Sequence, residues 1–268
     1  MLVSGSIETQ RGAVQMSREN ERPPSLENLI ESVNLKLDVL HPGGLEITKE
    51  LAELCRINKD AKVLDVSSGT GESACFLAEQ FGCEVTGVDI SGYMVERARS
   101  KAAARGLTVE FKQGDAHNLP FDEHTFDVVI SECTTCLLEK ERAISEMVRV
   151  AKPGGYVGIH DISWKEDTPE QIKQKLAEIE GERPETLDGW KRLFEQAGLK
   201  NVVTVDKSSL IPDWEKGIRK ELGLVGELKI FLKVLTKWGI SGFKSVRASE
   251  QIFKSPHVCY GIIVGRKS

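Results

Sequence analysis

The sequence predicts an α/β fold, in which helices cover both faces of a doubly wound, mostly parallel sheet of seven strands. From residue 62 to residue 162 the chain alternates between short runs rich in Val and Ile and longer amphipathic segments. Gly82 and Gly106 follow two of these segments, where helices commonly end on a left-handed residue. Because parallel neighbours need helical crossovers, repeated strand–helix units favour such a sheet.

The individual elements follow the same periodicities. Strands are predicted at 62–67, 84–89, 108–113, 126–131, 156–162, 201–206 and 257–265. A first helix is predicted after Ser25 and before His41-Pro42, and further helices around 47–55 and at 72–81, 92–105, 140–151 and 186–198. Residues 1–24 are polar and aperiodic, so we expect a disordered leader, with 25–268 forming a single domain.

Bulk properties exclude several classes of protein. The 268 residues carry a net charge of −5, which gives no global basic field for nucleic acid. No apolar run reaches the length of a transmembrane helix, and the first residues lack the apolar stretch of a signal peptide. Six cysteines are scattered over predicted helices, strands and loops, which is typical of a cytoplasmic protein.

Residues 207–254 interrupt the strand–helix rhythm before the last strand. They contain ten Lys and Arg against five Asp and Glu. Apolar residues recur there at helical spacing, and lysines recur every four residues on another face. The stripe consists of Leu222, Val225, Leu228, Phe231, Leu232 and Leu235. We interpret the segment as a helical cap over an acceptor pocket, suited to an anionic or amphiphilic molecule or to peripheral membrane contact. The alternative is a purely structural helix packed on the edge of the sheet.

Acidic residues and a glycine-rich turn mark one edge of the predicted sheet. The first strand runs into Asp65-Val66-Ser67-Ser68-Gly69-Thr70-Gly71, and a helix starts at once. Asp89 ends the second strand, and Asp115 follows the third. The carboxyl ends of neighbouring parallel strands are where open α/β sheets bind ligands. A carboxylate at these places can accept the hydroxyls of a ribose or the exocyclic amine of adenine.

The stretches VLDVSSGTGES, VTGVDIS, GDAHNLPFDEHTFDVV and RVAKPGG resemble the successive motifs of class I, Rossmann-like methyltransferases that use S-adenosylmethionine. The resemblance covers about residues 45–160 and is nearest to the methyltransferase type 11 and ubiquinone/menaquinone methylase-like groups. One departure is Ser67, since the family usually has glycine there.

The resemblance implies a set of cofactor-binding residues. The first loop would hold the methionine part of the cofactor, Asp89 its ribose, and the residues after the second and third strands its adenine. The implied set is Asp65, Ser67, Gly69, Gly71, Asp89, Ile90, Met94, Asp115, Ala116 and Ser131. A dinucleotide-dependent dehydrogenase is the fold-level rival, but no third glycine completes G-x-G-x-x-G from position 67.

The segment after the fourth strand is expected to face the methyl acceptor. It lacks the N/D-P-P-Y/F motif of the N-methylases that act on nucleic acids and glutamine. This absence argues against the amino groups of bases as acceptors, and we favour a small molecule as the acceptor. Glu132, His160 and Asp161 are the predicted catalytic residues, because they can orient an acceptor or take its proton. A solvated loop acid and a hydrogen-bonded strand-end pair are the structural alternatives.

Cys133 and Cys136 form a lone C-x-x-C pair without further ligands at matching spacing, so we expect two ordinary thiols and no metal. Cys133 also stands where arsenite methyltransferases carry a thiol, and a thiol or arsenite acceptor stays open. A macromolecular acceptor docked by the basic insertion is a further alternative. A non-catalytic, methyltransferase-like partner subunit is another, because of Ser67.

Overall fold

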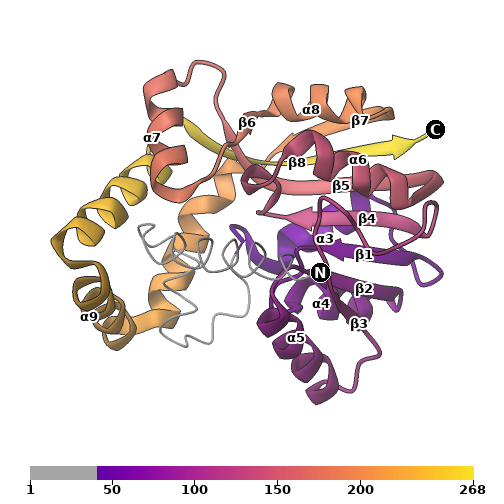
Figure 1. Cartoon of the computed structure of the whole chain (residues 1–268), viewed down its shortest axis with the longest axis horizontal. Helices are drawn as coiled ribbons and strands as arrows, with labels where there is room; N and C mark the ends of the chain where they lie inside the picture. Colours follow the sequence, from indigo (N-terminus) through magenta and orange to yellow (C-terminus); the bar gives the residue numbers. More distant parts are fainter. Residues whose placement is uncertain (1–40) are drawn as a thin grey trace, which may run out of the picture.

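The computed structural model describes residues 41–268, without the side chains of 210–215 and 217–222. Its centre is one sheet in the order β3-β2-β1-β4-β5-β8-β7, with helices on both faces (Figure 1). The strands are β1 Lys62–Val66, β2 Glu84–Asp89, β3 Glu110–Gln113, β4 Phe126–Glu132, β5 Ala151–Trp164, β7 Leu199–Asp206 and β8 Val258–Lys267. Only β8 runs antiparallel to its neighbours. The predicted Rossmann-like, doubly wound fold is confirmed.

The strand number needs a small correction. A two-residue strand, β6 (Glu185–Thr186), pairs with the end of β5, which gives eight strands where the sequence predicted seven. Residue pairs Ser163–Glu185 and Trp164–Thr186 form this short ladder. Two residues are too few to show the period-2 alternation by which a strand is recognised in a sequence.

Most helices lie where they were predicted. They are α3 Gly44–Leu54, α4 Glu72–Phe81, α5 Gly92–Ala104, α6 Lys140–Val150, α7 Glu170–Glu180, α8 Leu187–Gln196 and α9 Ile211–Phe253, with short 3-10 turns η1 Thr135–Leu137 and η2 Ser208–Leu210. Helix α7 was not predicted, although Ile172, Leu176 and Ile179 recur in it at helical spacing; of the three, only Leu176 is fully buried. The predicted leader, 1–24, and the helix after Ser25 lie outside the described residues.

Apolar side chains pack against each face of the sheet. On one face, Val129 and Val157 pack with α6 and α8 through Ile144 and Phe194. The other face is covered by α3, α4 and α5, in a second cluster that includes Leu51, Cys75, Val95 and Ala98. Burial on both faces explains the near-continuous apolar runs of β1 and β4.

The helical insertion is present as α9, which is broken by non-helical glycines at Gly223 and Gly239. Strand β7 is parallel to β5 and ends where α9 begins, and β8 starts where α9 ends. Both ends of α9 therefore lie at the carboxyl edge of the parallel strands, and Figure 1 shows the helix extending beyond that edge. No helix among the described residues is both long and apolar enough to cross a membrane.

Candidate functional site

The loop between β1 and α4 has the backbone shape that its glycines predict. Ser67, Gly69 and Gly71 all have positive φ, at 61°, 50° and 76°. A side chain at Gly71 would meet Phe111 at 2.6 Å, so only glycine lets α4 start this close to the sheet. Nothing lies within 4 Å of the side-chain position of Gly69, so the loop presents bare backbone at the sheet edge. Backbone amides at a helix N-terminus favour an anionic group, such as a carboxylate.

Ser67 takes a left-handed conformation that costs a non-glycine residue about 1–2 kcal/mol. This explains in backbone terms why the family usually has glycine at this place. The serine is accommodated, and the loop still closes through the hydrogen bond from the Gly71 amide to the Ser68 carbonyl at 2.8 Å.

Asp89 ties the ends of the first two strands together. Its Oδ2 accepts from the Gly69 amide at 2.9 Å, and its Oδ1 accepts from the Ser91 amide at 2.8 Å. The Ser91 side chain in turn caps α5 by accepting from the Met94 amide at 3.3 Å. The carboxylate is therefore fixed at the end of β2, where each oxygen keeps a further lone pair for a ribose hydroxyl.

An apolar and an acidic residue stand on either side of the Asp89 carboxylate. Ile90 is 71% exposed and offers an apolar surface to a flat ring, whereas Met94, in the first turn of α5, is buried. Asp115 Oδ1 accepts from the amide of His117 at 2.8 Å. That backbone bond, with the His117 side chain, lowers the pKa of Asp115. The neighbouring Ala116 is buried.

Asp65 is a buried acid without a hydrogen-bond partner on one oxygen. Its side chain is 2% exposed, and Oδ2 has no partner among the described residues. Burial, with the charges of Glu132 and Asp89 nearby, raises the pKa of Asp65 well above its usual range. The hydroxyls of Ser68 and Ser131 are likewise buried and unpartnered among the residues that the structure describes. These polar atoms fit the ammonium and sulfonium groups of S-adenosylmethionine.

A second group of polar side chains adjoins Asp65. The Thr48 hydroxyl, on α3, lies 3.1 Å from both carboxylate oxygens of Glu132 and 3.3 Å from His41 Nε2. His41 Nε2 is 3.6 Å from Glu132 Oε2. His160 is paired in register with Glu132 on the adjacent strand, and its ring stands edge-on to that of His41 at 5.8 Å. The structure thus brings Glu132 and His160 together.

Asp161 lies on the other face of β5. It accepts from the amides of Cys136 at 3.2 Å and Ile162 at 2.8 Å, so it anchors the turn after β4. Burial raises the pKa of Asp161 to about 6. Adjacent strand residues point to opposite faces, which is why His160 and Asp161 are not brought to one site.

The two cysteines of the C-x-x-C pair have different environments. Cys136 is 2% exposed, and burial with the nearby Asp161 raises its pKa well above the usual range, as for an inert buried thiol. Cys133 is half-buried, with positive φ, and its sulfur lies 3.7 Å from His160 Nδ1. All six cysteines are free thiols.

Thr48 was missed in the sequence, and His41 was noted only as a residue before the first core helix. A threonine inside an amphipathic helix carries no signal of function. The turn His41-Pro42-Gly43-Gly44 is the one local sign, since Gly43 and Gly44 both have positive φ and turn the chain into α3.

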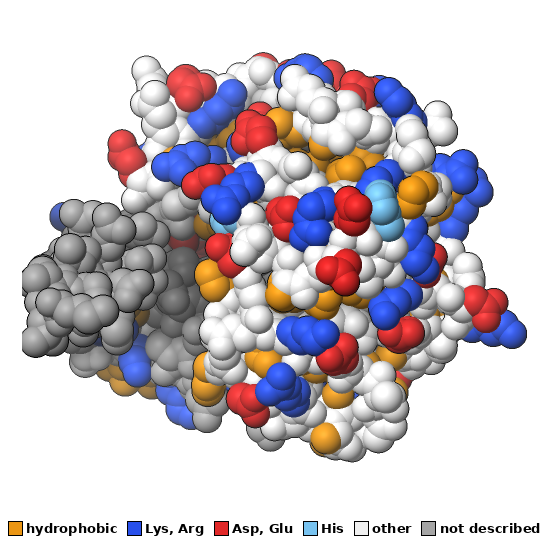
Figure 2. Space-filling view, turned by 45° about the vertical axis from the view of Figure 1, so that its right-hand side comes forward, with side chains coloured by type: hydrophobic (Ala, Val, Ile, Leu, Met, Phe, Trp, Pro, Cys, Tyr) orange, Lys and Arg blue, Asp and Glu red, His pale blue; other side chains and the backbone are white. Residues whose placement is uncertain are grey.

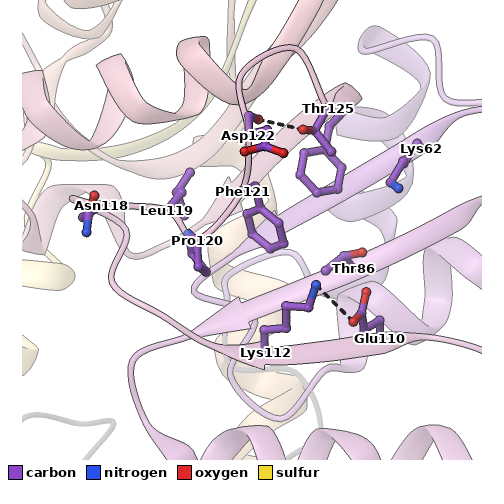
Figure 3. Close-up of a pocket in the computed structure, with 11 residues that line it drawn as sticks. Lys62, Thr86, Glu110, Lys112, Asn118, Leu119, Pro120, Phe121, Asp122 and Thr125 are labelled. Atoms are coloured by element: carbon purple, nitrogen blue, oxygen red, sulfur yellow. Dashed lines mark hydrogen bonds and ion pairs between the residues drawn. The ribbon is translucent and has the colours of Figure 1, made fainter.

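A groove of about 540 Å³ lies elsewhere, between the sheet and the loop that joins β3 to β4 (Figure 3). Lys62, Glu110 and Phe126 line it, and they are the first residues of β1, β3 and β4. The groove is therefore at the amino end of the parallel strands, away from Asp65 and Asp89. Open α/β sheets bind their ligands at the opposite end.

Comparison with known proteins agrees with this geometry. A family model described as a methyltransferase domain matches residues 57–207. An uncharacterized protein of Haemophilus influenzae is 33% identical over 214 residues, which cover 76% of this chain and 84% of that protein. Phosphoethanolamine N-methyltransferase 1 of Triticum aestivum is 30% identical over 68% of this chain, but the match covers only 36% of the wheat enzyme.

The same fold is found in phosphoethanolamine N-methyltransferase 2 of Haemonchus contortus, solved in complex with S-adenosyl-L-methionine. The two structures superpose with a TM-score of 0.70 at 19% identity, over 89% of this chain and 56% of that one. With a family model covering more than half of the sequence, the chain belongs to the methyltransferase-domain family and is a class I methyltransferase that uses S-adenosylmethionine.

Proposed function

We propose that this enzyme transfers the methyl group of S-adenosylmethionine to a small-molecule acceptor that binds beside Glu132 and His160. One observation carries the proposal. Polar side chains of α3, β4 and β5 converge next to Asp65, at the carboxyl edge where the cofactor-binding residues also lie. The wheat relative is named for a small acceptor, phosphoethanolamine, which supports the same class of substrate.

Residue roles on the cofactor side follow from the contacts. We propose that Asp89 holds the ribose, that Ile90 and Met94 cover the adenine and that Asp115 with Ala116 bind its edge. Ser67, Gly69, Gly71 and Ser131 would surround the methionine part, and Asp65 would offset its positive charge. The cofactor supplies an electrophilic methyl group on a sulfonium. Holding the acceptor in line and excluding water is then the main task of the protein.

On the acceptor side, Glu132 and His160 would contact the molecule that is methylated. Burial, with His41 and Lys207 nearby, lowers the pKa of His160 well below its usual value, so its imidazole is neutral at pH 7. A neutral imidazole and a carboxylate both offer lone pairs that can orient a hydroxyl, thiol or amine. Asp161 would act on this site through the turn after β4 that it anchors.

Helix α9 would form the approach to this site. Its two ends lie at the carboxyl edge, and the members of the predicted stripe whose side chains are described are exposed instead of packed on the sheet. Exposed apolar residues include Leu224, Val225, Leu228, Phe231, Leu232 and Leu235. Lysines border them, so we propose that this surface receives an anionic or amphiphilic acceptor, or the membrane that contains it. By contrast, Figure 2 shows charges of both signs interspersed over the face that it draws, which does not suit nucleic acid.

Label transfer tests the proposed function. The purified enzyme is incubated with methyl-labelled S-adenosylmethionine and a cell extract separated into small and large molecules. We expect label in a small product and a large loss of label with Glu132→Gln, while affinity for S-adenosylhomocysteine is retained. Label only in macromolecules would refute the small-molecule acceptor. Cofactor binding without any transfer would favour a non-catalytic partner subunit.

The six free thiols favour a reducing, cytoplasmic compartment for the reaction.

A further inference from the structure

Three possible metal ligands from distant parts of the sequence meet beside the proposed acceptor site. His41 precedes α3, Glu132 ends β4 and His160 lies in β5. One ligand atom from each lies within 4.8 Å of the other two. His41 is 8% exposed, His160 is fully buried and the Glu132 side chain is 5% exposed. Solvated surface acids often gather without a ligand, but two imidazoles and a carboxylate removed from water are a different case.

Two nitrogens of this cluster have no hydrogen-bond partner in the described part of the chain. They are His160 Nε2 and His41 Nδ1, and both are buried. A buried polar atom left without a partner destabilises the folded state, so such atoms in a folded protein point to a ligand. This observation is independent of the convergence of the three side chains.

The cluster is also held in place by its surroundings. The Thr48 hydroxyl lies 3.1 Å from both oxygens of Glu132 and so orients the carboxylate. Parallel pairing of β4 and β5 fixes Glu132 and His160 side by side. Residues that hydrogen-bond a ligating side chain fix its orientation in this way at metal sites.

We propose that His41, Glu132 and His160 bind a divalent first-row transition metal ion of the zinc class. Two histidines and one carboxylate, with positions left open for a substrate, suit zinc, and the same set also takes iron or cobalt. Ligand atoms lie about 2.0–2.2 Å from zinc and hence a little over 3 Å from one another, so the side chains need to close by up to about 1.5 Å. The sequence-based expectation of no metal considered only Cys133 and Cys136, and these three ligands are separated by 91 and 28 positions in the chain.

The role of the ion rests on the proposed function. An acceptor hydroxyl or thiol that coordinates the ion loses its proton to water more readily. A lone pair of the resulting anion forms the bond to the methyl carbon, and the electrons of the breaking carbon–sulfur bond stay on the cofactor's sulfur. Acceptors that are already nucleophilic, such as free amines, gain nothing from the ion. The inference therefore narrows the acceptor to a hydroxyl or a thiol.

Metal binding is tested on the full chain, stripped with a chelator and titrated with Zn²⁺ or Co²⁺. We expect one equivalent to bind, with visible d–d absorption for Co²⁺. The affinity should fall at least about 100-fold in each of His41→Ala, Glu132→Gln and His160→Asn. His124→Ala is the matched control, because His124 is a partly exposed histidine away from the cluster. Circular dichroism and thermal unfolding identify any variant that fails to fold. Glu132→Gln is conservative in size, so it still tests the carboxylate as a ligand if a histidine variant does not fold.

Two outcomes would overturn the proposal. One is no binding beyond a weak affinity that all variants share. The other is binding that depends on Cys133, shown by loss in Cys133→Ser and retention in His41→Ala. Calorimetry with S-adenosylhomocysteine on the stripped protein separates this result from the proposed function. Cofactor binding and methyl transfer without metal would refute the role of the ion alone, whereas metal binding without methyl transfer would refute the proposed function alone.

Discussion

Replacing Asp89 with alanine separates two tasks of one carboxylate. In the structure it accepts from the amides of Gly69 and Ser91 at 2.9 and 2.8 Å. Hydrogen bonds to a charged group contribute about 1.5–3 kcal/mol each, but water replaces part of this at a half-exposed site. We therefore expect the free energy of unfolding, without ligand, to fall by about 1–3 kcal/mol. Urea denaturation measures this loss.

The second task, which we propose, is to hold the ribose of the cofactor. Loss of two further charge-assisted hydrogen bonds amounts to about 3–6 kcal/mol, which raises Kd for S-adenosylhomocysteine between about 100-fold and about 10,000-fold. Isothermal titration calorimetry measures this change directly. Glu84→Ala is the control, because Glu84 is an exposed acid at the opposite end of the same strand.

The two measurements together decide the assignment of Asp89. A variant that is less stable but binds the cofactor product within about threefold of the parent would refute the ribose role. Asp89 would then be only a connection between the glycine loop and α5. A variant with normal stability and lost affinity would instead show that Gly69 and Ser91 find other acceptors.

Three further predictions concern the loop after β1, an ion pair on α6 and the exposed surface of α9. Ser67→Gly should raise the free energy of unfolding by about 1 kcal/mol in urea denaturation, because φ is 61°, and Ser67→Ala should give no such gain. The hydrogen bond from Arg149 lowers the pKa of Glu146 in the folded protein. The stability that this pair contributes is therefore present above the pKa of Glu146 in the unfolded chain, and it is lost as pH falls through the pKa of Glu146 in the folded protein. Glu146→Gln should flatten that acid limb in thermal unfolding, and an unchanged limb would contradict the pairing. Leu228→Ser/Leu232→Ser should weaken sedimentation with anionic vesicles, unlike Val203→Ser on exposed β7; equal loss in both would refute a specific α9 surface.

Local spacing was enough to predict that the proposed cofactor-binding residues share one edge of the sheet. Asp65, Asp89 and Asp115 each follow a strand, and parallel strands bring their carboxyl ends to one edge whatever the rest of the chain does. Gly71 could be placed for the same reason, since a turn from β1 directly into α4 needs a close approach. The strand β6 was missed because two residues are too few to produce a periodic pattern, whereas the helical spacing of Ile172, Leu176 and Ile179 in α7 was overlooked.

The register of the sheet explains the mixed outcome for the predicted catalytic residues. Glu132 and His160 are register partners, and their meeting depends on where β4 and β5 align, which no pattern within either strand reveals. Asp161 was grouped with His160 because the two are consecutive in the sequence. Consecutive residues of a strand face opposite sides, so the same adjacency is the reason that Asp161 lies with Cys136.

The proposed acceptor site includes parts of the chain whose positions could not be predicted from the strand spacing. Helix α3 contributes Thr48, the turn before it contributes His41, and α9 begins and ends at the same edge. None of these is fixed by the strand spacing that positions the proposed cofactor-binding residues, so they can change while Asp65 and Asp89 keep their places. A substitution in this outer set should therefore alter the acceptor or its rate of methylation before it alters cofactor affinity. Glu132→Gln and His41→Ala test this order when cofactor binding and label transfer are determined on the same preparation. Label transfer should fall in both variants while the affinity for the cofactor stays close to that of the parent.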